Sequence, residues 1–105
     1  MSTYPYRVVV TGMAGVTSLG HDWDTQFSNL KKEQNAVQYM GIWDEYLDLN
    51  TRLGAPIHDF VLPAHYTRKV TRGMGKVAQM AVRASEMALE DAGLLDDPWL
   101  KSGEV

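Results

Sequence analysis

The sequence predicts an α/β fold, and three features of the chain carry that prediction. A β-branched segment occupies residues 7–11, a glycine-containing turn leads into a helix over about residues 23–32, and a long helix with small residues on one face spans residues 76–92. A strand, a turn and a helix in this order are the usual start of an α/β unit. One strand cannot complete a sheet, so we expect the chain to be part of a domain or to be completed by another chain.

The predicted strand and the first helix each have a clear local pattern. Residues 7–11 read Arg-Val-Val-Val-Thr, an almost continuously apolar run that is typical of a strand buried on both faces. Asp22 is placed to cap the helix that follows, and a negative charge such as Asp24 is favourable in a first turn. The apolar residues of this helix recur three to four positions apart and are expected to form its apolar stripe. They are Trp23, Phe27 and Leu30.

The middle of the chain, about residues 34–62, is less regular, and we interpret it as an excursion from the main sheet. Apolar residues between Ile42 and Leu47 suggest a short amphipathic helix. Residues 51–57 are expected to be extended, with interruptions at Gly54 and Pro56.

The last third of the chain is predicted to be helical, with a break. Pro63 suits the first turn of a helix that would end near Arg72, and Gly73 and Gly75 then predict a break or kink. The helix over residues 76–92 has a stripe of mostly small side chains, against which another backbone can pack closely. Gly93 follows as the expected left-handed C-terminal residue. The stripe consists of Val77, Ala81, Ala84, Ala88 and Ala92.

Composition excludes several classes of function. The chain has 105 residues, an ordinary content of apolar and charged residues, and a formal net charge of −3, which argues against nucleic-acid binding by net charge. The sequence has no cysteine, so disulfides, a thiolate nucleophile and cysteine-bound zinc are all excluded for these residues. No apolar run reaches the roughly 20 residues of a membrane span, and a cytoplasmic location is expected.

The glycines and histidines do not match a known ligand motif. The dinucleotide-binding fingerprint needs glycine at its first, third and sixth positions, where this chain has Gly12, Ala14 and Thr17. A tight crossing from strand to helix is the preferred explanation, and a small nucleotide-binding protein is the alternative that ligand-dependent melting would test. His21, His58 and His65 stand singly without the spacing of a metal site, and Ser18 lacks a nucleophile elbow. We therefore expect neither a cofactor nor a metal.

A basic run is the strongest candidate for a binding site. Arg68, Arg72 and Lys76 are four residues apart, with Lys69 beside them and Arg83 near the same side. Cations near the start of a helix oppose its macrodipole, so stability alone does not explain them. From these residues alone a solvated basic face is favoured, and docking of an acidic partner is the functional alternative.

Five segments in order resemble the β-ketoacyl-acyl-carrier-protein synthases of the thiolase superfamily. Those enzymes begin with a strand of the form R-V-V-[VI]-T-G followed by V-T-P-L-G, and contain a G-x-[VI]-x-D-F step and an alanine-rich helix ending in A-L-x-D-A-G-L. Ser18 stands in place of the usual proline. The matching parts of this chain are residues 7–20, the helix with Trp23 and Leu30, residues 54–60, residues 68–74 and residues 84–94.

The resemblance implies more than the residues show by themselves. It implies that residues 1–105 are the N-terminal segment, an incomplete domain, of a layered αβαβα thiolase-type fold. The parent would be a homodimeric acyltransferase of the elongating, synthase I/II-like type. It would condense malonyl-carrier protein with an acyl group held on a cysteine, and that cysteine and its supporting histidines lie in segments beyond these residues. No catalytic residue is therefore assigned to this chain.

The resemblance also changes the interpretation of the basic run. In the family this segment helps to dock the acidic acyl carrier protein, so docking becomes the favoured role of four residues. They are Arg68, Lys69, Arg72 and Lys76. Fatty acid elongation is the simplest pathway, and a polyketide or polyene ketosynthase or a cysteine-less chain-length partner stays open. A stand-alone module that binds an acidic protein is the alternative outside this family.

Overall fold

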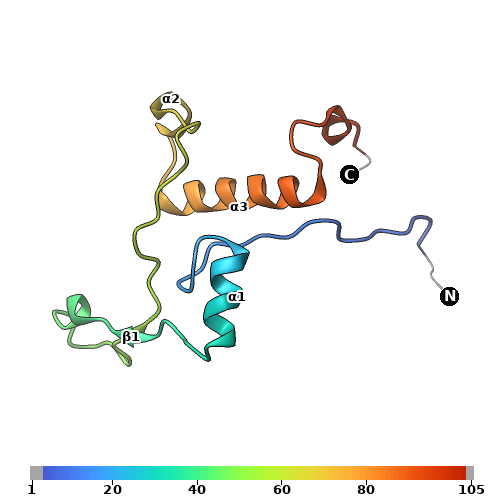
Figure 1. Cartoon of the computed structure of the whole chain (residues 1–105). Coiled ribbons are helices and arrows are strands. Elements are labelled where there is room, and N and C mark those ends of the chain that lie inside the picture. The colour runs from blue at the N-terminus through green and yellow to red at the C-terminus, as the bar shows by residue number, and fades with distance from the viewer. Residues whose placement is uncertain (1–3, 104–105) are drawn as a thin grey trace.

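The computed structural model describes residues 4–103 and shows helices and short strands that are spread apart in space. In Figure 1 the long helix α3 crosses the molecule, the extended N-terminal segment runs below it, and α1 stands roughly across that segment. A small two-stranded arm lies at the far end of α1. The elements in chain order are α1 (Trp23–Lys31), β1 (Gln38–Tyr39), the 3-10 helix η1 (Gly41–Trp43), β2 (Leu53–Gly54), α2 (Arg68–Thr71), α3 (Lys76–Ala92) and the 3-10 helix η2 (Pro98–Lys101).

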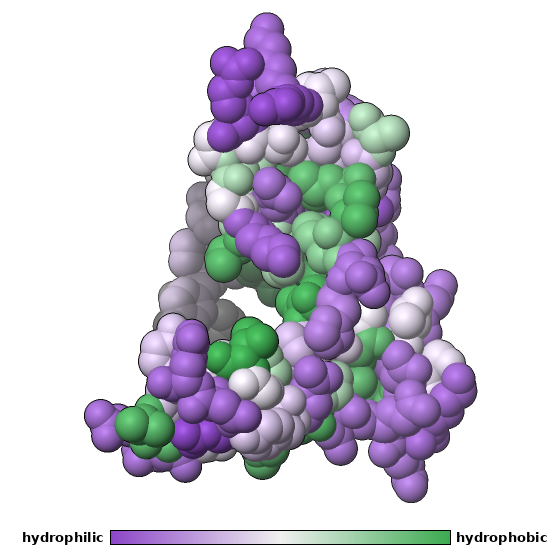
Figure 2. Space-filling view, turned by 90° about the vertical axis from the view of Figure 1, so that its left-hand side faces the viewer, coloured by the Kyte–Doolittle hydropathy of each residue, from purple (hydrophilic) through white to green (hydrophobic). Residues whose placement is uncertain are grey.

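The described residues do not enclose an apolar core. The radius of gyration is 18.3 Å, against about 13 Å for a compact chain of this length. The accessible surface is 8865 Å², against roughly 5,900 Å² for a folded monomer of this size. No apolar residue among residues 4–103 is buried, and Figure 2 shows apolar side chains open at the surface. Most of the apolar surface is therefore available to pack against something outside this chain.

The strand predicted at residues 7–11 does not form within this chain. The segment is extended, but it pairs with no other strand among residues 4–103. Val8 is 90% exposed, as expected of a strand whose two faces and two edges lack their neighbours. The sequence pattern thus describes a strand suited to burial, which no sheet among residues 4–103 covers.

The N-terminal segment nevertheless packs against the small-residue face of α3. A Cβ atom added to Gly12 would lie 2.3 Å from the carbonyl oxygen of Ala88 and 2.7 Å from the backbone nitrogen of Ala92. The backbone nitrogen of Met13 donates a hydrogen bond of 3.0 Å to Oδ2 of Asp91. The close backbone approach predicted for the alanine stripe is confirmed at its C-terminal half.

Helix α1 begins and ends where the sequence predicts, but the side of the helix that packs against the preceding loop is polar. Asp22 caps the helix and accepts a hydrogen bond of 2.8 Å from the backbone nitrogen of Thr25. Gln26 is only 8% exposed, and its side-chain amide donates to the carbonyl oxygens of Gly15 at 2.7 Å and Gly20 at 3.2 Å. This buried amide fixes the loop between the N-terminal segment and α1.

The predicted apolar stripe of α1 is exposed instead of buried. The rings of Trp23 and Phe27 stack with centroids 5.3 Å apart, and the ammonium of Lys31 lies 4.4 Å from the Phe27 ring centroid. Leu30 is also exposed. Trp23 and Phe27 cover each other in part, and all three side chains remain exposed in the described chain.

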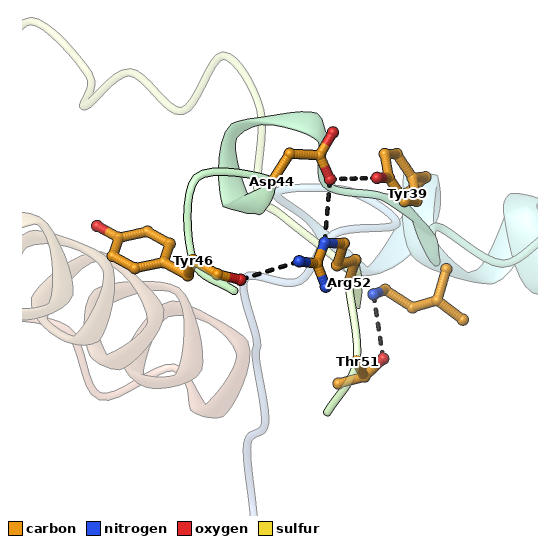
Figure 3. A network of polar contacts seen from close by, with 6 residues as sticks. Tyr39, Asp44, Tyr46, Thr51 and Arg52 are labelled. Carbon is orange, nitrogen blue, oxygen red and sulfur yellow. Dashed lines mark hydrogen bonds and ion pairs between the residues drawn. The ribbon is translucent and has the colours of Figure 1, made fainter. Parts of the chain in front are cut away.

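Within the range predicted as an excursion, about residues 34–62, residues 38–54 form a small arm held by polar contacts. β1 and β2 pair antiparallel, and the predicted amphipathic helix is reduced to the single turn of η1. Figure 3 shows the centre of the arm, where Nε of Arg52 donates to Oδ1 of Asp44 at 3.1 Å and the other end of the guanidinium donates to the carbonyl oxygen of Tyr46 at 2.9 Å. The hydroxyl of Tyr39 donates to the same Asp44 oxygen, which raises the pKa of this phenol. Arg52, at the end of the loop between the strands, is thus bonded to two residues in the first half of that loop.

The helical third of the chain confirms the predicted break and corrects one helix start. Pro63 begins a turn, in which the nitrogen of Tyr66 donates to the Pro63 carbonyl at 3.0 Å, and α2 begins only at Arg68 after its Thr67 cap. The chain leaves helical structure between α2 and α3, as the glycines predict. α3 spans the predicted residues and ends at Gly93, whose φ of 72° is the left-handed conformation that glycine favours.

Candidate functional site

The structure places the predicted docking residues on an exposed segment before and at the start of α3. Arg68 and Lys69 open α2, Arg72 is its C-terminal cap, and Lys76 is the first residue of α3. All four are exposed, and none forms an ion pair with another residue of 4–103. We call residues 67–76 the basic segment. Its four charges are unpaired within the described chain.

The four cations do not lie on one continuous helix. Residues 73–75 separate α2 from α3, and in Figure 1 α2 projects away from the start of α3. The spacing of four residues therefore does not align Lys76 with Arg68 and Arg72, as the break predicted at Gly73 and Gly75 implies. The charges are instead grouped around a protruding turn, where a partner can approach them.

The charges at the two ends of α3 have different explanations. At the N-terminal end, Gly75 provides no side-chain cap and the first turn has no acidic residue, so Lys76 faces the positive end of the helix dipole, at a cost of about 0.3–1 kcal/mol. At the C-terminal end, Asp91 has a structural role because it accepts the hydrogen bond from Met13. Lys76 has no ion-pair partner among residues 4–103, whereas Asp91 is held by this hydrogen bond.

Arg83, expected near the same side, does not belong to the basic segment. Its guanidinium forms an ion pair with Glu86 one turn later on α3, and Nε2 of His65 lies 2.7 Å from the other oxygen of that carboxylate. Burial raises the pKa of Glu86, but the hydrogen bonds from His65 and Arg83 outweigh it and hold this pKa below the usual range. The i,i+3 spacing of Arg83 and Glu86 was visible in the sequence, whereas the contact with His65 depends on tertiary structure.

The side chains of His21 and His65 form hydrogen bonds within the chain, and His58 contributes its backbone carbonyl to the first of them. Nε2 of His21 lies 2.9 Å from the carbonyl oxygen of His58, and its ring meets Phe60 edge-on at 5.4 Å between centroids. No group of three potential metal ligands occurs among residues 4–103. The expected surface or loop positions of the histidines fit these contacts.

The glycine turn contains no phosphate cradle at Gly12. The space beside its Cα is filled by the backbone of α3, as the contacts with Ala88 and Ala92 require. The tight crossing preferred from the sequence therefore explains this glycine. In the part of the chain that the structure describes, no helix is both long and apolar enough to cross a membrane.

The family follows from comparison with known proteins. The sequence model described as "Beta-ketoacyl synthase, N-terminal domain" matches residues 6–103, nearly the whole chain. The chain belongs to this family. A β-ketoacyl synthase from Burkholderia phymatum STM815 has a similar crystal structure, with a TM-score of 0.78 and 50% sequence identity, over 90% of this chain and 23% of that one. The thiolase-type α/β fold class is thereby confirmed.

Curated relatives of this β-ketoacyl synthase segment carry a more specific name. The chloroplastic 3-oxoacyl-[acyl-carrier-protein] synthase II of Arabidopsis thaliana is 33% identical over 91 residues, which are 87% of this chain and 17% of that protein. The 3-oxoacyl-[acyl-carrier-protein] synthase 1 of Haemophilus influenzae is 30% identical over 92 residues, 87% of this chain and 22% of that protein. The chain thus spans about a fifth of the length of these relatives.

Proposed function

We propose that this chain works as the N-terminal part of a 3-oxoacyl-acyl-carrier-protein synthase in fatty acid biosynthesis. The full enzyme would be an acyltransferase that joins the carbon chain of malonyl-carrier protein to an acyl thioester with loss of carbon dioxide. The names of the curated relatives support this reaction, and the absence of cysteine here means that the acyl-bearing nucleophile comes from elsewhere. Within that enzyme, residues 1–105 would form part of the N-terminal domain, in a cytoplasmic homodimer without a cofactor.

The observation that carries the proposal is the uncovered apolar surface combined with the family match. Residues 7–11 have the composition of a central strand and no strand partner among residues 4–103, and the apolar residues of α1 are exposed. Burying apolar surface contributes about 25 cal/mol per Å², so these surfaces favour association with a larger body. A stand-alone module that binds an acidic protein would instead need a core of its own.

Within the enzyme, the role of this chain would be to bind the acyl carrier protein. The basic segment offers Arg68, Lys69, Arg72 and Lys76 without internal ion pairs. Charges of this kind attract an acidic partner and set its orientation, and their contribution weakens as salt screens them. In this role the segment binds the protein that carries the thioester, while proton transfer and carbon–carbon bond formation take place on other residues.

A hybrid enzyme tests the proposal. The matching segment of the Burkholderia phymatum β-ketoacyl synthase is replaced by this chain, and we refer to the product as the hybrid synthase. We expect it to fold and to release carbon dioxide from malonyl-carrier protein with formation of a 3-oxoacyl product. A hybrid that folds with the parent's thermal stability but does not condense these substrates would contradict the proposal. The unmodified parent serves as the control for substrate quality.

A further inference from the structure

A carboxylate on α3 joins the chain before the basic segment to the middle of the helix. Glu86 lies ten residues beyond Lys76, about 15 Å along the axis. One of its oxygens is 2.7 Å from Nε2 of His65, and the other accepts from the guanidinium of Arg83. The side chain of Glu86 is only 17% exposed, whereas that of His65 is 59% exposed. The contact with His65 spans 21 residues of sequence and is a tertiary contact.

The chemistry of this contact determines which group donates the hydrogen bond and which accepts it. A carboxylate only accepts hydrogen bonds, so Nε2 of His65 carries the proton in the contact. Burial raises the pKa of Glu86, but the hydrogen bonds from His65 and Arg83 and a further one from Tyr66 lower it more, so the carboxylate is charged at neutral pH. The groups that face Glu86 are thus two from the chain before α2, His65 and Tyr66, and Arg83 from its own helix.

The basic segment has one contact with α3 on each side of its cations Arg68, Lys69 and Arg72. α2 is a single turn of four residues, too short to be stable by itself. On its C-terminal side the side chain of Gln79 donates to the carbonyl oxygen of Met74 at 3.3 Å, whereas a Cβ atom added at Gly73 or Gly75 would meet no other atom within 4 Å. On its N-terminal side His65 and Tyr66 directly precede Thr67, the cap of α2. On the N-terminal side of the docking residues, the contact at Glu86 is therefore the nearest tertiary contact.

We propose that Glu86 is a positioning residue for carrier-protein docking, because it holds the turn at His65 and Tyr66 against α3 and so fixes the direction of the basic segment. This inference rests on the docking function proposed above. Glu86 itself does not touch the carrier protein. It acts through His65 and Tyr66 on the orientation of residues 68–72.

The sign of the effect separates positioning from plain electrostatics. Replacing Glu86 removes a negative charge and leaves the region more positive, so simple attraction predicts tighter binding of an acidic carrier protein. Positioning predicts weaker binding, because the segment must be ordered when the carrier binds. Glu90 provides a matched control, since it is an exposed glutamate one turn later on α3 that forms no ion pair among residues 4–103.

The experiment compares Glu86→Ala, Glu86→Gln and Glu90→Ala in the hybrid synthase. For Glu86→Ala we expect the KM for malonyl-carrier protein to rise roughly five- to thirtyfold, the factor that corresponds to ordering about one residue. The KM for a carrier-free malonyl thioester and the kcat should stay within about twofold of the parent hybrid, because the reacting groups are untouched. Glu86→Gln keeps one acceptor oxygen and should show a smaller rise, and Glu90→Ala should show none.

Amide hydrogen exchange of residues 63–72 provides a readout that does not need the carrier. Exchange should accelerate in Glu86→Ala and not in Glu90→Ala. Faster exchange with an unchanged or lower KM for the carrier substrate would overturn the positioning role and leave docking intact. A parent hybrid that uses the carrier-free thioester but not the carrier substrate would remove the docking function, and this inference with it.

Discussion

Gly12 lies so close to Ala92 that a Cβ atom at Gly12 would be 2.8 Å from the Cβ atom of Ala92. Real carbon atoms that are not bonded to each other do not approach to this distance, so the contact requires glycine on one side. Together with the Met13–Asp91 hydrogen bond of 3.0 Å, it fastens the end of the extended N-terminal segment across the C-terminal half of α3. This contact fixes the relative position of the predicted strand and the alanine-faced helix.

Replacing Gly12 by alanine is therefore expected to destabilise the protein. The new methyl group would meet backbone atoms, 2.3 Å from the Ala88 oxygen, and backbone cannot move aside as a flexible side chain does. Overpacking of this kind costs about 1–3 kcal/mol, and this site should lie at or above the upper end. The measurement is the midpoint of thermal unfolding of the hybrid synthase. Gly15→Ala is the control, because a Cβ atom there meets nothing within 4 Å. Equal midpoints for the two variants would show that the close contact does not exist in solution.

The cap of α1 should contribute a pH-dependent part of the stability. The backbone hydrogen bond from Thr25 lowers the pKa of Asp22, so the charged carboxylate is favoured in the folded state. This contribution is complete above the ordinary aspartate pKa of about 3.9 and is lost as pH falls through the lower, folded-state value. We expect Asp22→Ala to cost about 1 kcal/mol near neutral pH, with the difference from the parent shrinking below about pH 3.9. Denaturant midpoints measured across this range check it.

The matched variant for this cap is Asp22→Asn. Asparagine caps helices about as well as aspartate and does not titrate, so its stability relative to alanine should be independent of pH. If the free energy of unfolding changes with pH in the same way in the parent and in Asp22→Asn, titration of Asp22 is not the cause of the pH dependence.

Local patterns predicted α1 and α3 well because each has its signals in neighbouring residues. Asp22 and Gly93 define helix ends through contacts within a few residues, and the structure places both ends as predicted. The predicted strand at residues 7–11 failed as an element because a strand needs partners that a local pattern cannot supply. The burial of Gln26 was not predicted for a related reason. Its acceptors are the carbonyls of Gly15 and Gly20, and a local sequence pattern does not indicate which backbone groups a polar side chain will bind.

The residues of the candidate docking site could be predicted from the sequence, but their arrangement in space could not. Arg68, Lys69, Arg72 and Lys76 are visible as a basic run, and the glycines that break the helix were visible too. The role of Arg83 was not, because its pairing with Glu86 competes with any role on the surface and the third partner, His65, comes from 18 residues earlier. Long-range pairing decides which charges of a run are free for a partner.

Charge reversal in the basic segment should weaken carrier binding. Arg72→Glu replaces an exposed, unpaired cation by an anion, and each exposed charge pair contributes up to about 1 kcal/mol, roughly fivefold in affinity. We expect the KM of the hybrid synthase for malonyl-carrier protein to rise by at least that factor at low salt, with a smaller difference at high salt. Lys101→Glu makes the same change of charge on η2, outside the segment, and should leave this KM within about twofold. An Arg72→Glu variant that matches Lys101→Glu at low salt would exclude Arg72 from docking.

The isolated chain should not unfold cooperatively, because residues 4–103 do not enclose the apolar core that makes unfolding a single transition. Its surface of 8865 Å² exceeds the roughly 5,900 Å² of a folded monomer of this size, and the excess includes the apolar residues Val8, Val9 and Val10. We expect urea titration of the isolated 105 residues, followed by far-ultraviolet circular dichroism, to give a broad and gradual loss of helix, since short helices without tertiary packing are marginal in water. A dye that binds apolar surface should fluoresce strongly in its presence and weakly with the hybrid synthase, in which the same residues are covered. A sharp transition with the denaturant dependence of a 105-residue globular protein would instead mean that the chain closes its own core, and the stand-alone binding module would then replace the proposed role in a larger synthase.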